Sequence, residues 1–131
     1  MVGVDLAETD PVAPNVSVLA LDMTEPESVE RIATALGRPA DAVLCDAAPK
    51  LTGVRDVDLA AIEELYTAAL QIARRTLSPG GFVIVKGFPG QESDLFRKEL
   101  RRVFAKVGEI RPEGKRATSK EFYWVASGLR A

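Results

Sequence analysis

Short apolar runs that end on a polar residue alternate along this chain with segments whose apolar residues recur at helical spacing. The strand-like runs cover residues 1–6, 16–21, 42–45, 82–85, 107–110 and 122–126. Strands that alternate with helices predict an α/β fold with a mostly parallel sheet and helices on both faces. The last two strands have no helix between them, which predicts an antiparallel hairpin at one edge.

Three helices are expected between these strands. Thr24 and Glu27 have capping-box spacing, which predicts a helix start there, and Gly37 ends that helix. The longest helix spans residues 59–77, a turn covers 78–81, and a third helix spans 94–104. The apolar residues expected to form the helical stripes are Val29, Ile32, Ala33, Leu36, Leu59, Ile62, Leu65, Ala69, Ile72, Leu77, Phe96, Leu100, Val103 and Phe104.

Length and composition are those of one globular domain, residues 1–131. The hydrophobic content is 47% and the charged content 27%, which is ordinary for a globular protein. No apolar run approaches the roughly 18 residues of a membrane span and no leader opens the sequence, so a cytoplasmic protein is expected. With one Cys and no His, we expect neither a disulfide nor a metal site, and acid–base chemistry would fall to Lys, Asp, Glu or Tyr.

Charge is distributed unevenly along the chain. Residues 1–64 carry four Lys or Arg against thirteen Asp or Glu, and residues 65–131 carry thirteen against six. Clustered basic side chains can neutralise phosphates, so the second half could bind a polyanion. The alternative is a solvated helix face followed by a charged loop.

Two acids close early strands. Ligands bind beyond the carboxyl ends of strands in an open α/β sheet, and acids there commonly accept hydrogen bonds from ribose hydroxyls. Asp5 fits that role, and Asp22 could contact an adenine. The alternative is that both acids close strands because Asp favours turns and helix caps.

Asp46 and Lys86 follow two later strands and form a second candidate cluster. A Lys directly after a run of four apolar residues is rarely buried without a partner, and a neighbouring strand could deliver Asp46 beside it. Glu121 could enter the same cleft from the last hairpin. A catalytic role and a structural ion pair are both open for this cluster.

Three segments carry a family resemblance. Residues 46–49 (DAAP), 80–86 (GGFVIVK) and 119–123 (SKEFY) resemble three motifs of the FtsJ/RrmJ-type ribosomal RNA ribose 2′-O-methyltransferases, in order and in approximate spacing. The opening residues 4–6 (VDL) with 10–11 (DP) are similar to the family's second strand and its exit. The resemblance covers nearly the whole chain.

The resemblance implies methylation of an RNA ribose 2′-hydroxyl with S-adenosylmethionine as cofactor, and large-subunit rRNA uridine (23S rRNA or the large ribosomal subunit) as the expected substrate. It matches Asp46, Lys86 and Glu121 to the last three members of the family's Lys-Asp-Lys-Glu tetrad. Asp5, Asp22 and Asp46 match its cofactor contacts. The basic residues expected to hold RNA phosphates are Arg97, Arg101, Lys115, Arg116 and Lys120.

The resemblance also predicts a difference. Family members begin with a helix bearing the first tetrad Lys, then a strand and a Gly-rich loop, and none of these precedes Met1. We therefore expect a Rossmann-like methyltransferase sheet without its first, central strand, leaving two unpaired edges between the strands that begin at Met1 and Ala42. A catalytically inactive RNA-binding remnant and a generic nucleotide-binding α/β domain are the alternative functions.

Overall fold

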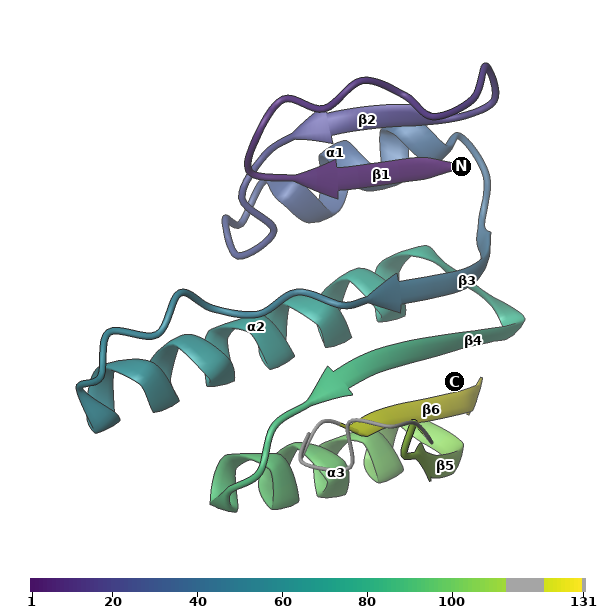
Figure 1. Cartoon of the computed structure of the whole chain (residues 1–131). Helices are drawn as coiled ribbons and strands as arrows, with labels where there is room; N and C mark the ends of the chain where they lie inside the picture. Colours follow the sequence, from purple (N-terminus) through teal and green to yellow (C-terminus); the bar gives the residue numbers. More distant parts are fainter. Residues whose placement is uncertain (113–121, 131) are drawn as a thin grey trace.

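A computed structural model describes residues 1–112 and 122–130 of the chain. The element order of the α/β fold in Figure 1 follows the predicted alternation. The elements are β1 (Val2–Asp5), β2 (Ser17–Ala20), α1 (Ser28–Leu36), β3 (Ala40–Cys45), α2 (Arg55–Thr76), β4 (Leu77–Gly87), α3 (Gln91–Val103), β5 (Phe104–Ile110) and β6 (Phe122–Leu129).

The strands form two sheets. β1 and β2 make a two-stranded parallel sheet, and the second sheet has the order β3-β4-β6-β5. β3 and β4 are parallel, whereas β6 is antiparallel to both β4 and β5. The predicted antiparallel pair at one edge is confirmed, with β5 as the outermost strand. Within the described residues β1 pairs only with β2 and β3 only with β4, so the two expected unpaired edges are present (Figure 1).

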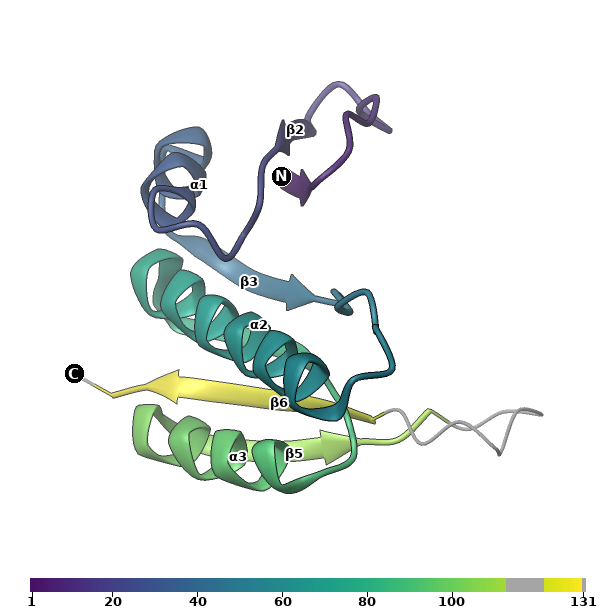
Figure 2. The ribbon, with the colours of Figure 1, turned by 90° about the vertical axis from the view of Figure 1, so that its left-hand side faces the viewer.

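The described helices lie on one face of the sheets, not on both as predicted. α1 packs against α2 and α2 against α3, and Figure 2 shows them stacked along the same side. The connections through α1, α2 and α3 all cross the sheets in the same direction, and right-handed crossovers then place every helix on the same face. The connection from β1 to β2 runs the other way, but it contains no helix. On the opposite face Leu44 is 71% exposed and Phe82 39% exposed.

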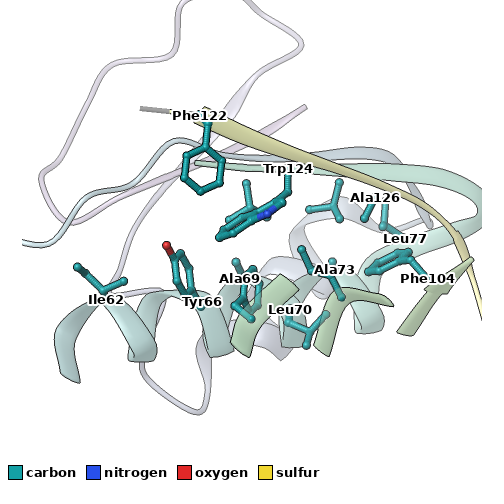
Figure 3. Packing of buried hydrophobic residues seen from close by; sticks show 14 residues of the cluster. Ile62, Tyr66, Ala69, Leu70, Ala73, Leu77, Phe104, Phe122, Trp124 and Ala126 are labelled. Atoms are coloured by element: carbon teal, nitrogen blue, oxygen red, sulfur yellow. The ribbon is translucent and has the colours of Figure 1, made fainter. Parts of the chain in front are cut away.

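The core lies between α2, α3 and the four-stranded sheet. α2 turns a column of residues that includes Tyr66, Ala69 and Ala73 toward β4 and β6, and the two alanines are 1% and 0% exposed. These small side chains let the helix approach the sheet closely. Trp124 of β6 fills the space beside them, with its ring 5.3 Å from Tyr66 and 4.9 Å from Phe122 (Figure 3).

Three predicted details of the local structure were wrong. The capping box at Thr24 does not form, because Thr24 donates to the Asp22 carboxylate and α1 begins only at Ser28. α2 begins four residues before the predicted start at Leu59, through a mostly charged turn in which the single apolar residue, Val57, is exposed. The predicted turn at 78–81 belongs to β4, whose register against β3 shifts there: Ala40 pairs with Leu77 but Ala42 with Phe82.

The first turn of α2 depends on a carboxylate. Asp58 accepts hydrogen bonds from Thr52 N (2.8 Å), Thr52 Oγ1 (2.8 Å) and Gly53 N (3.0 Å). The backbone and side-chain donors of Thr52 hold the pKa of Asp58 below its usual value. The carboxylate therefore fixes the loop that leads into the helix.

This arrangement predicts an acid-labile contribution to stability. A depressed folded-state pKa contributes stability above the ordinary Asp pKa of about 3.9, and that stability is lost as the pH falls through the lower folded value. Urea unfolding at a series of pH values measures this contribution. In this acid range the free energy of unfolding of Asp58→Asn should fall less than that of the parent chain. Asp56→Asn in the same turn is the control, and equal acid profiles for the parent and Asp58→Asn would contradict the assignment.

Candidate active site

Three adjacent strands bring three polar side chains together near the carboxyl ends of β3 and β4. Cys45 pairs with Val85 at the end of β3, so the next residues, Asp46 and Lys86, lie side by side. On the other side of β4, Lys86 pairs with Tyr123 of β6. Asp46, Lys86 and Tyr123 thus form a row across β3, β4 and β6 where β3 and β4 end.

The row is joined by an ion pair and a hydrogen bond. Lys86 Nζ lies 3.5 Å from Asp46 Oδ1, and the Tyr123 hydroxyl donates to the same oxygen at 3.1 Å. The Lys86 side chain is 15% exposed, whereas that of Asp46 is 71% exposed. The expected pairing of Asp46 with Lys86 is confirmed; its catalytic role remains a prediction. A largely buried ammonium held by a solvated carboxylate can act on a substrate that arrives from the solvent side.

The row faces away from the helices. Side chains alternate along a strand, so Asp46 projects on the same side as exposed Leu44, and Lys86 on the same side as Phe82. The helices cover the opposite face, where Val83, Val85 and Trp124 are buried. The candidate site therefore opens at the carboxyl edge of β4, on the face that no described helix covers.

Asp5 and Asp22 lie at the carboxyl ends of β1 and β2, the strands of the two-stranded sheet. Asp5 accepts a hydrogen bond from the amide of Ala7 at 3.2 Å and is exposed. Asp22 accepts from the Thr24 hydroxyl (2.6 Å) and amide (2.9 Å), and these donors lower the pKa of Asp22. Both acids thus close local turns, as the alternative interpretation expected. Each still presents a carboxylate at the strand ends, and no described contact joins either acid to Asp46 or Lys86.

Cys45 precedes Asp46 but is a poor candidate nucleophile. Burial raises the pKa of its thiol, and the neighbouring Asp46 carboxylate acts in the same direction. Only the thiolate is an effective nucleophile. The chemistry of this edge therefore falls to Lys86 and its oxygen partners.

The basic residues are spread along α3 and β5. Arg97 lies in the helix and contacts Asp94 at 3.8 Å, whereas Arg101 is exposed in the last turn, at the opposite edge from Lys86. Arg111 follows β5 at the candidate edge, with its guanidinium 5.2 Å from the centre of the Phe122 ring. The remaining predicted site residues, Lys115, Arg116, Lys120 and Glu121, lie outside the described residues.

Tyr123 is a site residue that the sequence reasoning missed. The resemblance includes Tyr123 in the motif at residues 119–123 but assigns its side chain no role. The signal was present in the alternation of β6, where Phe122 and Trp124 face the core, which turns Tyr123 to the side of Lys86.

Removal of the Tyr123 hydroxyl should have a moderate effect. Tyr123→Phe keeps the aromatic ring but removes the donor to Asp46. The rate of a reaction that depends on the row should therefore fall roughly two- to tenfold, because one hydrogen bond is worth about 0.5–1.5 kcal/mol. Steady-state kinetics measure the rate, and thermal unfolding checks that the fold is unchanged. An unchanged rate would mean that this bond does not orient Asp46.

Among residues 1–112 and 122–130, no group of three or more His, Cys, Asp or Glu residues is placed to hold a metal ion. Nor does this part of the chain contain a helix long and apolar enough to cross a membrane.

A mixed α/β sheet with helices packed on it and polar residues at the carboxyl ends of its parallel strands has the architecture of the Rossmann-like class. Comparison with protein families is more specific. Residues 1–129 match the FtsJ-like methyltransferase family, and the chain belongs to that family.

Two relatives from different organisms share one name. The chain is 42% identical over 129 residues to the ribosomal RNA large subunit methyltransferase E of Methanothrix thermoacetophila, a match that covers 98% of this chain and 50% of the relative. It is also 42% identical over 126 residues to the protein of that name from Chromohalobacter salexigens, covering 95% of this chain and 60% of the relative. The chain therefore spans about half to three fifths of the length of these two relatives.

A solved structure supports the fold. A protein from Plasmodium falciparum, provisionally assigned as a ribosomal RNA methyltransferase, superposes with a TM-score of 0.80 at 23% identity. The superposition covers 98% of this chain and 71% of the other. At this identity the likeness concerns the architecture alone.

Proposed function

We propose that this chain carries out methylation of an RNA ribose 2′-hydroxyl with S-adenosylmethionine as the methyl donor, and that large-subunit rRNA is its substrate. The observation that carries the proposal is the row of Asp46, Lys86 and Tyr123 at the carboxyl edge of the sheet. Membership of the FtsJ-like methyltransferase family supports it, as do the names of the two relatives, which specify ribosomal RNA of the large subunit.

Lys86 is the proposed catalytic residue. A ribose hydroxyl is a weak nucleophile at neutral pH, so the protein must orient its oxygen and manage its proton. The Lys86 ammonium can stabilise negative charge that develops on that oxygen. Asp46 holds the ammonium from one side at 3.5 Å. Glu121, the third proposed catalytic residue, lies outside the described residues.

The acids at the strand ends suit the nucleoside part of the methyl donor. Ribose hydroxyls and an adenine amino group are hydrogen-bond donors, and Asp5, Asp22 and Asp46 offer carboxylate acceptors at this edge. Asp5 and Asp46 are exposed there. When bound, S-adenosylmethionine supplies an already activated methyl group. The three acids are therefore the proposed cofactor contacts.

Arg97, Arg101, Lys115, Arg116 and Lys120 are the proposed RNA-binding residues, and the position of Arg111 adds it to them. Arg111 is 67% exposed and lies at the same edge as Lys86. A guanidinium there can pair with a phosphate next to the reacting ribose. Arg101, on the opposite edge, would contact RNA farther from the reaction.

RNA affinity should fall steeply with salt. If half of the six proposed residues contact phosphates, three contacts predict a loss of affinity of about 20- to 40-fold between about 50 and about 200 mM salt. Fluorescence anisotropy with a labelled rRNA fragment measures the slope of log affinity against log salt concentration. Arg111→Ala should reduce the magnitude of this slope by about one. Arg38→Ala, which removes an exposed arginine paired with Asp41 at the far edge, is the control. A salt-independent affinity would contradict the proposed surface.

The test of the proposed function is a methylation assay that identifies the product. The chain is incubated with large-subunit rRNA and S-adenosylmethionine carrying a labelled methyl group, and the RNA is digested to nucleosides for mass spectrometry. The proposal predicts label on a ribose 2′-oxygen. Label on a base, or none from a folded chain, would contradict it.

A further inference from the structure

The turn that follows Lys86 is short and is held from two helices. β4 ends at Gly87, and α3 begins at Gln91, so residues 88–90 alone carry the chain from the sheet edge into the helix. Lys86 lies two residues before this turn begins. Any shift of the turn is therefore transmitted to the backbone of Lys86.

A closed ring of hydrogen bonds fixes the turn. The Phe88 amide donates to Tyr66 Oη at 3.0 Å, and Tyr66 Oη lies 2.9 Å from Ser93 Oγ. The Ser93 hydroxyl donates to the Phe88 carbonyl. Because the single Ser93 hydrogen is used in that bond, Tyr66 must be the donor to Ser93. Each hydroxyl thus donates once and accepts once, and both backbone groups of Phe88 are satisfied by side chains.

The two hydroxyl groups of this hydrogen-bond ring belong to buried residues that are packed against other side chains. Tyr66 is 3% exposed and Ser93 6% exposed. Tyr66 stacks on Phe96 with ring centres 4.5 Å apart, and Figure 3 shows it directed from α2 toward Phe122 and Trp124. Burial also raises the pKa of the Tyr66 hydroxyl, so it stays protonated and able to donate at neutral pH.

A third residue, Phe122 of β6, packs against the same segment at Gly87. The Phe122 ring lies so close to Gly87 that any side chain at position 87 would collide with it. The peptide from Lys86 to Phe88 is therefore held by Tyr66 of α2, Ser93 of α3 and Phe122 of β6.

We propose that Tyr66 and Ser93 are positioning residues for Lys86, which they hold against Asp46 by fixing the turn at Phe88. The inference rests on the proposed catalytic role of Lys86. Neither hydroxyl is placed to touch a substrate, because both lie on the helix-covered side of the sheet. Their effect on the reaction passes through the backbone of residues 86–88.

The first test reads the position of Lys86 without any reaction. Trace acetylation followed by mass spectrometry gives the labelling rate of Lys86 relative to Lys50, Lys98 and Lys106 in the same chain. Tyr66→Phe and Ser93→Ala should each raise the relative rate at Lys86, because its 15% exposed side chain is released from Asp46. Thr76→Val is the matched control, since it removes another buried hydroxyl bond of α2, to the Ile72 carbonyl, far from the turn.

The second test separates the inference from the proposed function. Tyr66→Phe should lower kcat for RNA methylation roughly ten- to hundredfold, with KM little changed, because a shift of the order of 1 Å misaligns the reacting groups. If Lys86→Ala leaves methylation unchanged, the proposed function fails. If Lys86→Ala lowers the rate but Tyr66→Phe changes neither kcat nor Lys86 labelling beyond the Thr76→Val control, only the positioning role is overturned.

Discussion

Replacement of Lys86 by Ala is expected to lower the rate of RNA methylation by about 10²- to 10⁴-fold, the range that a positioned proton-handling group contributes. The ammonium lies 3.5 Å from Asp46 at the strand ends, where a ribose oxygen can approach it from the solvent side. The fold should survive, because Asp46 is 71% exposed and remains solvated without its partner. Single-turnover kinetics with labelled methyl donor measure the rate.

Two further variants distinguish catalysis from a structural ion pair. Lys106→Ala removes an exposed lysine of β5 and should leave the rate unchanged. Asp46→Asn keeps the shape of the acid but removes its charge, so it should lower the rate while thermal unfolding changes little. If Lys86→Ala and Asp46→Asn both alter only the unfolding temperature, the row is a structural pair and the catalytic assignment is wrong.

Truncation of Trp124 should have the largest effect on stability. Trp124 is 1% exposed and contacts the rings of Tyr66, Phe96 and Phe122, with ring centres between 4.9 and 5.3 Å away. Trp124→Ala leaves a large cavity between α2, α3 and β6, and it should lower the free energy of unfolding by about 3–5 kcal/mol. Urea denaturation followed by far-UV circular dichroism measures the change.

Trp124→Phe is the informative control for this packing. Within the described residues the indole Nε1 is buried without a hydrogen-bond partner, so the smaller aromatic ring removes an unsatisfied donor as well as volume. We expect it to cost less than the Ala variant, because it keeps most of the buried aromatic volume. A loss as large as that of the Ala variant, or a small loss for both variants, would contradict the account in which the packing of the aromatic ring supplies the stability.

Sequence patterns predicted the parts of this fold that depend on local periodicity. The alternating strand and helix patterns, and the lack of a helical sequence pattern between residues 110 and 122, were enough to predict the α/β architecture and its antiparallel edge. The pairing of Asp46 with Lys86 followed from their places after two neighbouring strands. The two unpaired edges of β1 and β3 were expected only because of the family resemblance.

Features set by tertiary contacts were not predictable in the same way. The helices lie on one face because of crossover direction, which a list of elements does not contain. The predicted stripe of α2 omitted Tyr66 and Ala73, although both are buried, because their burial depends on how closely the helix approaches β4 and β6. The hydrogen-bond ring at Phe88 joins Tyr66 to Ser93, 27 positions away, and to Phe88, 22 positions away. No local sequence pattern connects these residues.

The central claim is that this chain itself holds S-adenosylmethionine at the edge that carries Lys86. A calorimetric titration of the folded chain with S-adenosylmethionine tests it most directly. We predict saturable binding in the micromolar range that is weakened by Asp5→Ala but not by Asp10→Ala. No binding by a chain whose circular dichroism and thermal unfolding show a native fold would contradict the claim, and would leave an RNA-binding domain of the same family that does not transfer methyl groups.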